Sequence, residues 1–229
     1  MLKINFAYLC GCPYRCPWCQ NADVALANPE VCREMEISEI IKNLKENFII
    51  DAVTITGGEP LMQNETFELC LRIKNETNLL LKIDHNGFYP ETLQKFLPLL
   101  DFIGLDIKAP FTEKYGSAVG RDDWKNVVER VRRTCEILAE WDGKKEARTT
   151  VVPTLTDESE IIEIAKIANK YKFSIYTLNE FRAERTLDEK FQNIAPYSYE
   201  KMLNLGKIAK EYLDKAEVYV VTSKKGRYS

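Results

Sequence analysis

Apolar stretches of two kinds alternate along the chain and predict strands and helices in turn. Short apolar runs, several of them β-branched, predict buried strands at 4–8, 52–56, 79–84, 102–107, 147–152, 173–178 and 218–221. Longer segments with apolar residues three or four positions apart predict helices at 38–48, 65–74, 90–97, 124–140, 157–171 and 198–213. In the first helix we expect Ile40, Ile41, Leu44 and Phe48 to share one side.

The strand–helix unit recurs about six times, which predicts βαβ crossovers and a parallel sheet in an α/β fold. A complete eight-unit barrel typically needs about 250 residues, and the chain has 229. We therefore expect a partial, open barrel or a doubly wound sheet. In both folds ligands bind where the parallel strands end. The distinctive turns at 57–60, 84–87 and 106–110 all follow predicted strands.

Composition narrows the class of protein without identifying it. The chain is 45% hydrophobic and 29% charged, as is ordinary for a globular protein. Its net charge of −3 gives no electrostatic reason to expect nucleic acid as a partner. We find no apolar run of membrane-spanning length and no secretion signal at the start. These features predict a cytoplasmic protein that binds neither nucleic acid nor membrane, with residues 1–229 forming one domain.

The cysteines are unevenly distributed. Four of the seven fall within ten residues, at Cys10, Cys12, Cys16 and Cys19. A disulfide framework would spread its pairs more evenly, so reduced, metal-binding cysteines suit this pattern better. Cys70 and Cys135 lie in helical patterns and are expected to be small core residues, and we assign no role to Cys32.

Cys12, Cys16 and Cys19 have the spacing C-x₃-C-x₂-C. Thiolates at such a spacing select zinc, copper(I) or an iron–sulfur cluster. A structural zinc site normally has four ligands, and Cys10 suits the fourth position poorly because it forms a C-x-C pair. Three thiolates on a four-iron cluster leave one iron open, whereas a ferredoxin uses four cysteines. The spacing favours a cluster with an open site, and zinc remains the alternative.

This motif resembles the signature of the radical S-adenosylmethionine (SAM) superfamily, in which three cysteines hold a [4Fe–4S] cluster and SAM chelates the fourth iron. Trp18 stands where that family usually has an aromatic residue, and Gly57-Gly58-Glu59-Pro60 resembles its turn for the SAM amino group. The resemblance implies a partial (β/α)6 barrel of radical SAM type, with a core at about 1–180 and an extension at about 181–229. It also implies an oxidoreductase that reductively cleaves SAM to methionine and a 5′-deoxyadenosyl radical.

Within that family, the chain looks most like the glycyl-radical-enzyme activating enzymes, especially the activating protein of anaerobic ribonucleoside-triphosphate reductase. The resemblance lies in Gln20-Asn21 and in the segments 83–87, 105–110 and 148–153. Such enzymes use the radical to remove a hydrogen atom from one glycine of a large partner enzyme. The resemblance therefore implies a glycyl radical enzyme as partner and an electron donor such as flavodoxin or ferredoxin.

The same resemblance implies roles for individual residues. Asp84, Asp106 and Lys108 would lie near SAM, with Lys108 meeting its carboxylate and the two aspartates able to hold a monovalent cation beside it. Asn21 would form a hydrogen bond with SAM, and the strand end at Val152 would flank its adenine.

Structural roles remain open for several of these residues. Asp106 and Lys108 share a strand face and could form a simple salt bridge. Arg148 could equally be a buried structural arginine bound to a carboxylate, and Phe181 either a core residue or a neighbour of the adenosine.

The chain also departs from its relatives at two positions. His85 replaces a common threonine and is expected to be only a strand-end residue, and Cys10 replaces a common glutamine and is expected to be a bystander thiol. There is no second group of cysteines, so one cluster is expected.

Two other functions compete with the activating enzyme. The first is a radical SAM enzyme that acts on a small molecule, such as a 7-carboxy-7-deazaguanine synthase. Those synthases often contain the sequence Cys-Pro-Trp-Cys, which this chain has at residues 16–19. Those synthases usually have Asp-Thr where this chain has Gln20-Asn21, and they use magnesium. The second is a non-enzymatic zinc or electron-transfer module, which would leave the turn at 57–60 and the pair Asp106 and Lys108 unexplained.

Overall fold

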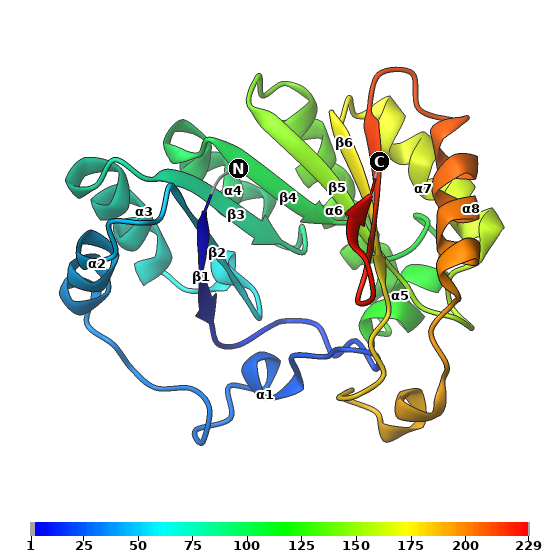
Figure 1. Ribbon diagram of the computed structural model, residues 1–229, viewed down its shortest axis with the longest axis horizontal. Coiled ribbons are helices and arrows are strands. Elements are labelled where there is room, and N and C mark those ends of the chain that lie inside the picture. The colour runs from blue at the N-terminus through cyan, green and yellow to red at the C-terminus, as the bar shows by residue number, and fades with distance from the viewer. Residues whose placement is uncertain (1–2, 229) are drawn as a thin grey trace.

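A single curled sheet organises residues 3–228, the part of the chain that the computed structural model describes (Figure 1). Seven strands lie in chain order and run parallel, and the eighth pairs antiparallel with the seventh. The strands are β1 (Ile4–Leu9), β2 (Ala52–Gly57), β3 (Leu80–His85), β4 (Phe102–Asp106), β5 (Lys144–Val151), β6 (Ile175–Glu180), β7 (Glu217–Thr222) and β8 (Gly226–Tyr228). Residues 1, 2 and 229 of the expected domain lie outside the described part.

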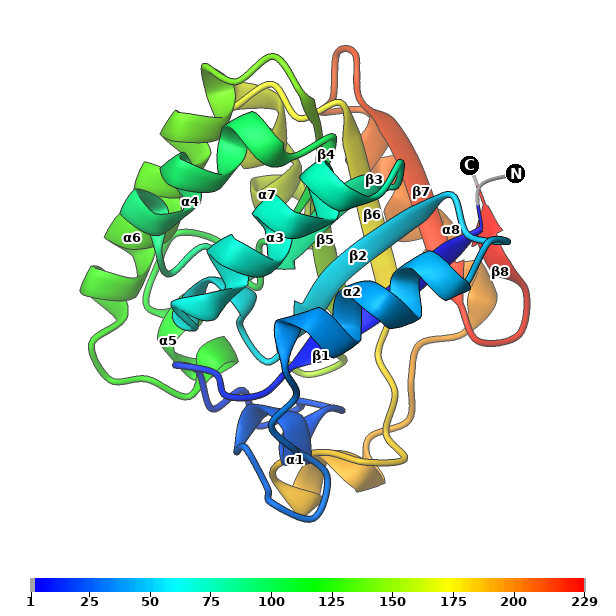
Figure 2. The same ribbon diagram turned by 90° about the vertical axis from the view of Figure 1, so that its left-hand side faces the viewer.

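Helices cover the convex face of the sheet, with α2 and α3 beside the first strands and α8 beside the last (Figures 1 and 2). The helices are α1 (Ala22–Ala25), α2 (Ile37–Glu46), α3 (Glu65–Glu76), α4 (Pro90–Phe96), α5 (Lys114–Val119), α6 (Trp124–Ala139), α7 (Glu158–Lys170) and α8 (Tyr199–Lys210). The architecture is an open half-barrel, which confirms the predicted α/β fold. Within residues 3–228 no helix is long and apolar enough to cross a membrane.

The two faces of the sheet differ in chemistry because side chains alternate along a strand. In β3, Leu81 and Ile83 are fully buried in the apolar core. Lys82 lies between these two residues and Asp84 follows them. Both belong to a group of charged side chains on the concave face. The helices supply the other half of the core, and α6 buries residues at helical spacing, Val127, Val128, Val131, Thr134, Cys135 and Leu138.

One helix prediction was wrong at its end. Helix α2 stops at Glu46, and Asn47 already has a non-helical conformation. Phe48 therefore does not continue the buried side of Ile41 and Leu44, and it is 92% exposed. The short elements α1, α5 and β8 were not predicted at all.

The segment between β6 and α8 returns to the N-terminal part of the chain. In Figures 1 and 2 it lies near α1, and the Asp188 amide donates a hydrogen bond to the Pro17 carbonyl at 2.9 Å. The loop that carries the cysteine motif is thus in contact with the C-terminal third of the chain.

Cys10 and Cys32 form a disulfide across that loop, with their Cα atoms 6.2 Å apart. This corrects the expectations that Cys10 is a bystander thiol and that Cys32 has no role, whereas Cys12, Cys16 and Cys19 are free thiols as expected. The loop folds back because the Asn28 side chain donates to Asp23 at 3.1 Å and the Cys32 amide donates to the Asn28 carbonyl at 2.8 Å. The expected core positions of Cys70 and Cys135 are confirmed, since both are fully buried.

We expect Cys32→Ser to destabilise the oxidised, metal-free protein. The disulfide joins residues 22 positions apart, and closing a loop of that length in the unfolded chain contributes about 3 kcal/mol in the chain-entropy model. Denaturant unfolding with and without a thiol reductant measures the effect. Reductant is expected to lower the stability of the wild type and leave Cys32→Ser unchanged, and an insensitive wild type would contradict the prediction.

Candidate active site

A cavity of about 410 Å³ opens at the C-terminal ends of the strands. Most of the residues expected to form a site line it together, namely Cys12, Cys16, Trp18, Cys19, Asn21, Gly57, Gly58, Asp84, Asp106 and Lys108. The first five come from the loop after β1, and the others from β2, β3, β4 and the turns that follow them. Arg148 and Phe181, whose roles were left open, also line the cavity.

Three of the expected residues do not line this cavity. Glu59 is fully buried, Pro60 begins a buried 3-10 turn, and Val152 is buried just after β5. Aromatic side chains that the sequence did not single out take part instead. Phe6 and Tyr8 of β1 line the cavity and are about half exposed.

The three motif thiols are shielded from water to different degrees. Cys16 is buried, whereas Cys12 and Cys19 are partly exposed. Burial raises the pKa of Cys12 to about 11 and that of Cys16 to about 12. Such thiols bind a metal only with release of their protons, so metal binding here is coupled to deprotonation.

The donor set suits a cluster. Among the described residues no group of three or more His, Cys, Asp or Glu side chains is placed to hold one metal ion. Iron–sulfur clusters are held by cysteine thiolates. Cys12, Cys16 and Cys19 are free thiols that line one cavity, and Cys10, the nearest fourth cysteine, is bonded to Cys32.

The turn after β2 meets the cysteine loop backbone to backbone. The Gly58 amide donates to the Leu9 carbonyl and the Glu59 amide to the Gly11 carbonyl, both at 2.7 Å. A Cβ atom on Gly58 would lie 2.0 Å from the Gly11 oxygen, and Gly57 has a φ of +122°. Only glycine allows this approach at both positions, because it has no Cβ and tolerates positive φ.

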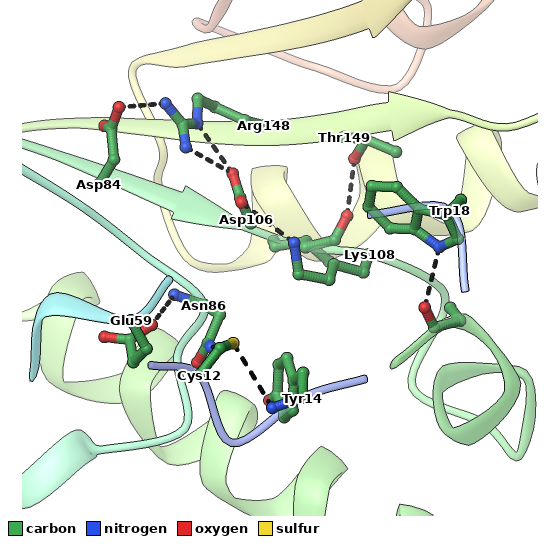
Figure 3. A network of polar contacts seen from close by, with 12 residues as sticks. Cys12, Tyr14, Trp18, Glu59, Asp84, Asn86, Asp106, Lys108, Arg148 and Thr149 are labelled. Atoms are coloured by element: carbon green, nitrogen blue, oxygen red, sulfur yellow. Dashed lines mark hydrogen bonds and ion pairs between the residues drawn. The ribbon is translucent and has the colours of Figure 1, made fainter. Parts of the chain in front are cut away.

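Backbone donors hold the Glu59 carboxylate. One carboxylate oxygen accepts from the Leu61 amide at 3.0 Å. The other accepts from the Asn86 amide at 2.7 Å (Figure 3). Burial nevertheless dominates and raises the pKa of Glu59 to about 7. The acid is therefore poised between its neutral and charged forms near neutral pH.

Arg148 on β5 bridges two carboxylates at the rim of the half-barrel (Figure 3). Its guanidinium pairs with Asp84 and, at 2.7 Å, with Asp106. Lys108 pairs with the other oxygen of Asp106 at 3.1 Å and lies 5.1 Å from the centre of the Trp18 ring. Both structural contacts that the sequence left open, the Asp106–Lys108 salt bridge and the Arg148–carboxylate pair, are thus present.

These charged groups shift one another's pKa values. Burial alone would raise the pKa of Asp106, but Arg148 and Lys108 outweigh it and hold that pKa below its usual value. Burial would lower the pKa of Lys108, and Asp106 outweighs this, so Lys108 keeps its positive charge. The cavity therefore offers a fixed cation beside the thiols.

Two buried polar residues were overlooked as parts of the site. Asn86 is 4% exposed and donates a side-chain hydrogen bond to the Cys12 sulfur at 3.6 Å. His85 is buried, its ring nitrogens have no hydrogen-bond partner among the described residues, and burial lowers its pKa to about 3, so it is neutral. Their place directly after a predicted strand was the available signal, but side-chain direction there is not readable from sequence.

We expect Arg148→Met to lower the free energy of unfolding by about 3 kcal/mol, because it leaves two largely buried carboxylates without their shared cation. Urea unfolding at neutral pH measures the loss. Arg132→Met is the matched control, since Arg132 pairs with Glu129 at 3.2 Å on the exposed side of α6 and should contribute less than about 1 kcal/mol. Equal losses in both variants would contradict the prediction.

Comparison with known proteins agrees with this architecture. The chain is 30% identical to MJ1227 of Methanocaldococcus jannaschii, whose name assigns it provisionally to the glycyl-radical enzyme activating enzymes, over 93% of this chain and 88% of that protein. It is 30% identical to the pyruvate formate-lyase-activating enzyme of Clostridium pasteurianum over 89% of each chain. A 7-carboxy-7-deazaguanine synthase of Thermococcus kodakarensis is 24% identical over 73% of this chain and 69% of its own length.

Solved structures share the fold at low sequence identity. Streptococcus suis SuiB, in a crystal structure bound to S-adenosylmethionine, superposes with a TM-score of 0.74 and 16% identity. The match covers 97% of this chain and 50% of SuiB, so the chain spans about half the length of that protein. The radical SAM superfamily model matches residues 8–168, well over half of the sequence. The chain therefore belongs to the radical SAM superfamily.

Proposed function

We propose that this protein is a glycyl-radical-enzyme activating enzyme. In this proposal SAM is reductively cleaved at a [4Fe–4S] cluster, and the resulting 5′-deoxyadenosyl radical removes a hydrogen atom from one glycine of a partner enzyme, such as an anaerobic ribonucleotide reductase. The observation that carries the proposal is the set of three free thiols around one cavity, with the nearest fourth cysteine held in a disulfide. Relatives named as activating enzymes along nearly the whole chain support the choice of substrate.

The thiolates of Cys12, Cys16 and Cys19 would hold the cluster and leave one iron for SAM. A bound cluster would supply the single electron, received from a donor such as flavodoxin or ferredoxin, that reductively cleaves SAM to methionine and the 5′-deoxyadenosyl radical. That radical becomes 5′-deoxyadenosine when it takes a hydrogen atom from glycine, and the unpaired electron stays on the glycine.

The remaining site residues would bind and orient SAM. Lys108 keeps its charge and lines the cavity, which suits the carboxylate of SAM. Glu59 is the candidate for the amino group, although it is fully covered, so contact with SAM requires the turn to shift. We assign Asn21 to hydrogen bonding with SAM because it lines the cavity beside the cysteines. The backbone after Trp18 would flank the adenine, and Trp18 lines the same cavity with Lys108 over its ring.

The proposal also includes a cation site, an adenine contact and a domain division. A monovalent cation bound by Asp84 and Asp106 would share both carboxylates with Arg148. Val152 does not line the cavity and would flank the adenine from behind the residues that do. We also propose a single domain with a core of about 1–180 and an extension of about 181–229, supported by the extension's β7 and β8 continuing the same sheet.

The alternative functions are less well supported. The 7-carboxy-7-deazaguanine synthase relative is less similar than the activating enzymes and matches a smaller share of the chain. The Gln20-Asn21 pair also differs from the Asp-Thr usual in those synthases. A zinc or electron-transfer module would give no reason for Lys108 and Asp106 to line the same cavity as the thiols.

We expect Cys16→Ala to lose the cluster and all SAM cleavage while the chain still folds. The protein is reconstituted with iron and sulfide without oxygen, and its iron content, visible absorption and 5′-deoxyadenosine formation with dithionite are measured. Cys70→Ala is the control, because Cys70 is a buried cysteine of α3 outside the cavity. A colourless wild type that holds zinc, or a Cys16→Ala variant that cleaves SAM, would refute the ligand assignment.

The partner is tested by mixing the reduced, SAM-loaded protein with a co-encoded glycyl radical enzyme. We expect a glycyl radical signal by electron paramagnetic resonance and transfer of deuterium from a glycine-labelled partner into 5′-deoxyadenosine. Replacing the target glycine by alanine is the control and should abolish both results. Rapid SAM cleavage with neither signal would argue for another substrate.

A further inference from the structure

Asn86 uses three of its polar groups at the junction between the turn after β2 and the cysteine loop (Figure 3). Its backbone amide donates to Glu59 at 2.7 Å. Its side-chain oxygen accepts from the Phe88 amide at 3.0 Å, and its side-chain nitrogen donates to the Cys12 sulfur at 3.6 Å. A hydrogen bond to sulfur is longer than one to oxygen because sulfur is the larger atom.

The direction of this side chain is fixed by its surroundings. The two ends of an amide differ, since the oxygen accepts and the nitrogen donates. Because the oxygen is engaged by the Phe88 amide, the nitrogen faces the sulfur. Thr134 of α6 also anchors the turn after β3, because its hydroxyl donates to the Gly87 carbonyl at 2.8 Å. The donor is therefore in place before any ligand binds.

A second donor reaches the same sulfur. The Tyr14 amide lies 3.5 Å from the Cys12 sulfur. That contact comes from the backbone of the cysteine loop, whereas Asn86 reaches the sulfur from the end of β3. The Asn86 contact is therefore the one that a side-chain substitution can remove.

Reducing an iron–sulfur cluster adds negative charge, part of which resides on its sulfur ligands. A donor directed at such a ligand stabilises the reduced form more than the oxidised form, so it makes reduction easier. We propose that Asn86 is a positioning residue that raises the reduction potential of the cluster through its hydrogen bond to Cys12. The inference rests on the proposed function, because it requires the cluster to be there.

The same residue also connects cluster and SAM site through its backbone. The bond from its amide to Glu59 does not depend on its side chain, so a substitution removes the bond to Cys12 and leaves the bond to Glu59. The two roles can thus be separated experimentally.

The test compares midpoint potentials of the reconstituted cluster, measured by redox titration followed by electron paramagnetic resonance. Asn86→Asp keeps the oxygen that accepts from Phe88 and replaces the donor to Cys12 by a second oxygen. Asn86→Ser shortens the side chain, which withdraws the amide donor from the sulfur without adding charge. We expect a more negative potential in both variants, with the larger shift in Asn86→Asp.

Thr134→Val is the matched control, because it loosens the same turn and keeps the Asn86 amide. Its potential should shift less than that of Asn86→Ser, because the donor itself remains. Unchanged potentials in Asn86→Ser, or an equal shift in Thr134→Val, would overturn the inference. So would failure of both Asn86 variants to assemble a cluster that the control assembles. A wild type that assembles no redox-active cluster would instead refute the proposed function.

Discussion

The contact on which the site depends is the backbone approach between the turn after β2 and the loop after β1. Gly58 and Glu59 donate to Leu9 and Gly11, and no side chain fits between the two segments. Because these bonds are made by the main chain, they hold the backbone of the turn against the backbone of the cysteine loop. Asn86, just after β3, contacts both segments, since its backbone amide donates to Glu59 and its side chain donates to Cys12.

The charged side chains on the concave face of the half-barrel are paired with charges of opposite sign. This face carries Asp84, Asp106, Glu146 and their cationic partners instead of the apolar layers that fill a closed barrel. Lys82 lies 3.0 Å from both Asp84 and Glu146, so the charges form a chain. Each buried charge is acceptable because its neighbour offsets the cost of removing it from water. The result is a polar, preorganised interior suited to a zwitterionic ligand.

Much of the fold and of the candidate site was predictable from the sequence because the signals are local. A run of β-branched residues followed by glycines marks a strand and its turn, and Cys12, Cys16 and Cys19 lie close in sequence. The predicted strand ends at 57–60, 84–87 and 106–110 meet in space because parallel strands end on the same edge.

The rest depended on contacts between distant segments. The disulfide needs the turn at Asn28 to bring Cys32 back to Cys10, and no periodicity reports that. Asn86 was quoted within a motif, yet its contact with Cys12 spans 74 positions. The covered state of Glu59 follows from the packing around it and not from its neighbours in sequence. The prediction for Phe48 was wrong for a local reason, since the helix ends at Glu46, two residues earlier than its apolar spacing suggested.

The contact between Asp188 and Pro17 has a consequence for biosynthesis. The cysteine loop is translated before the segment that carries Asp188, which contacts it. At typical translation speeds, the residues between Pro17 and Asp188 take roughly ten to thirty seconds to make. This contact forms only once the ribosome has passed Asp188, so iron and sulfide can enter a site that includes it only after that point.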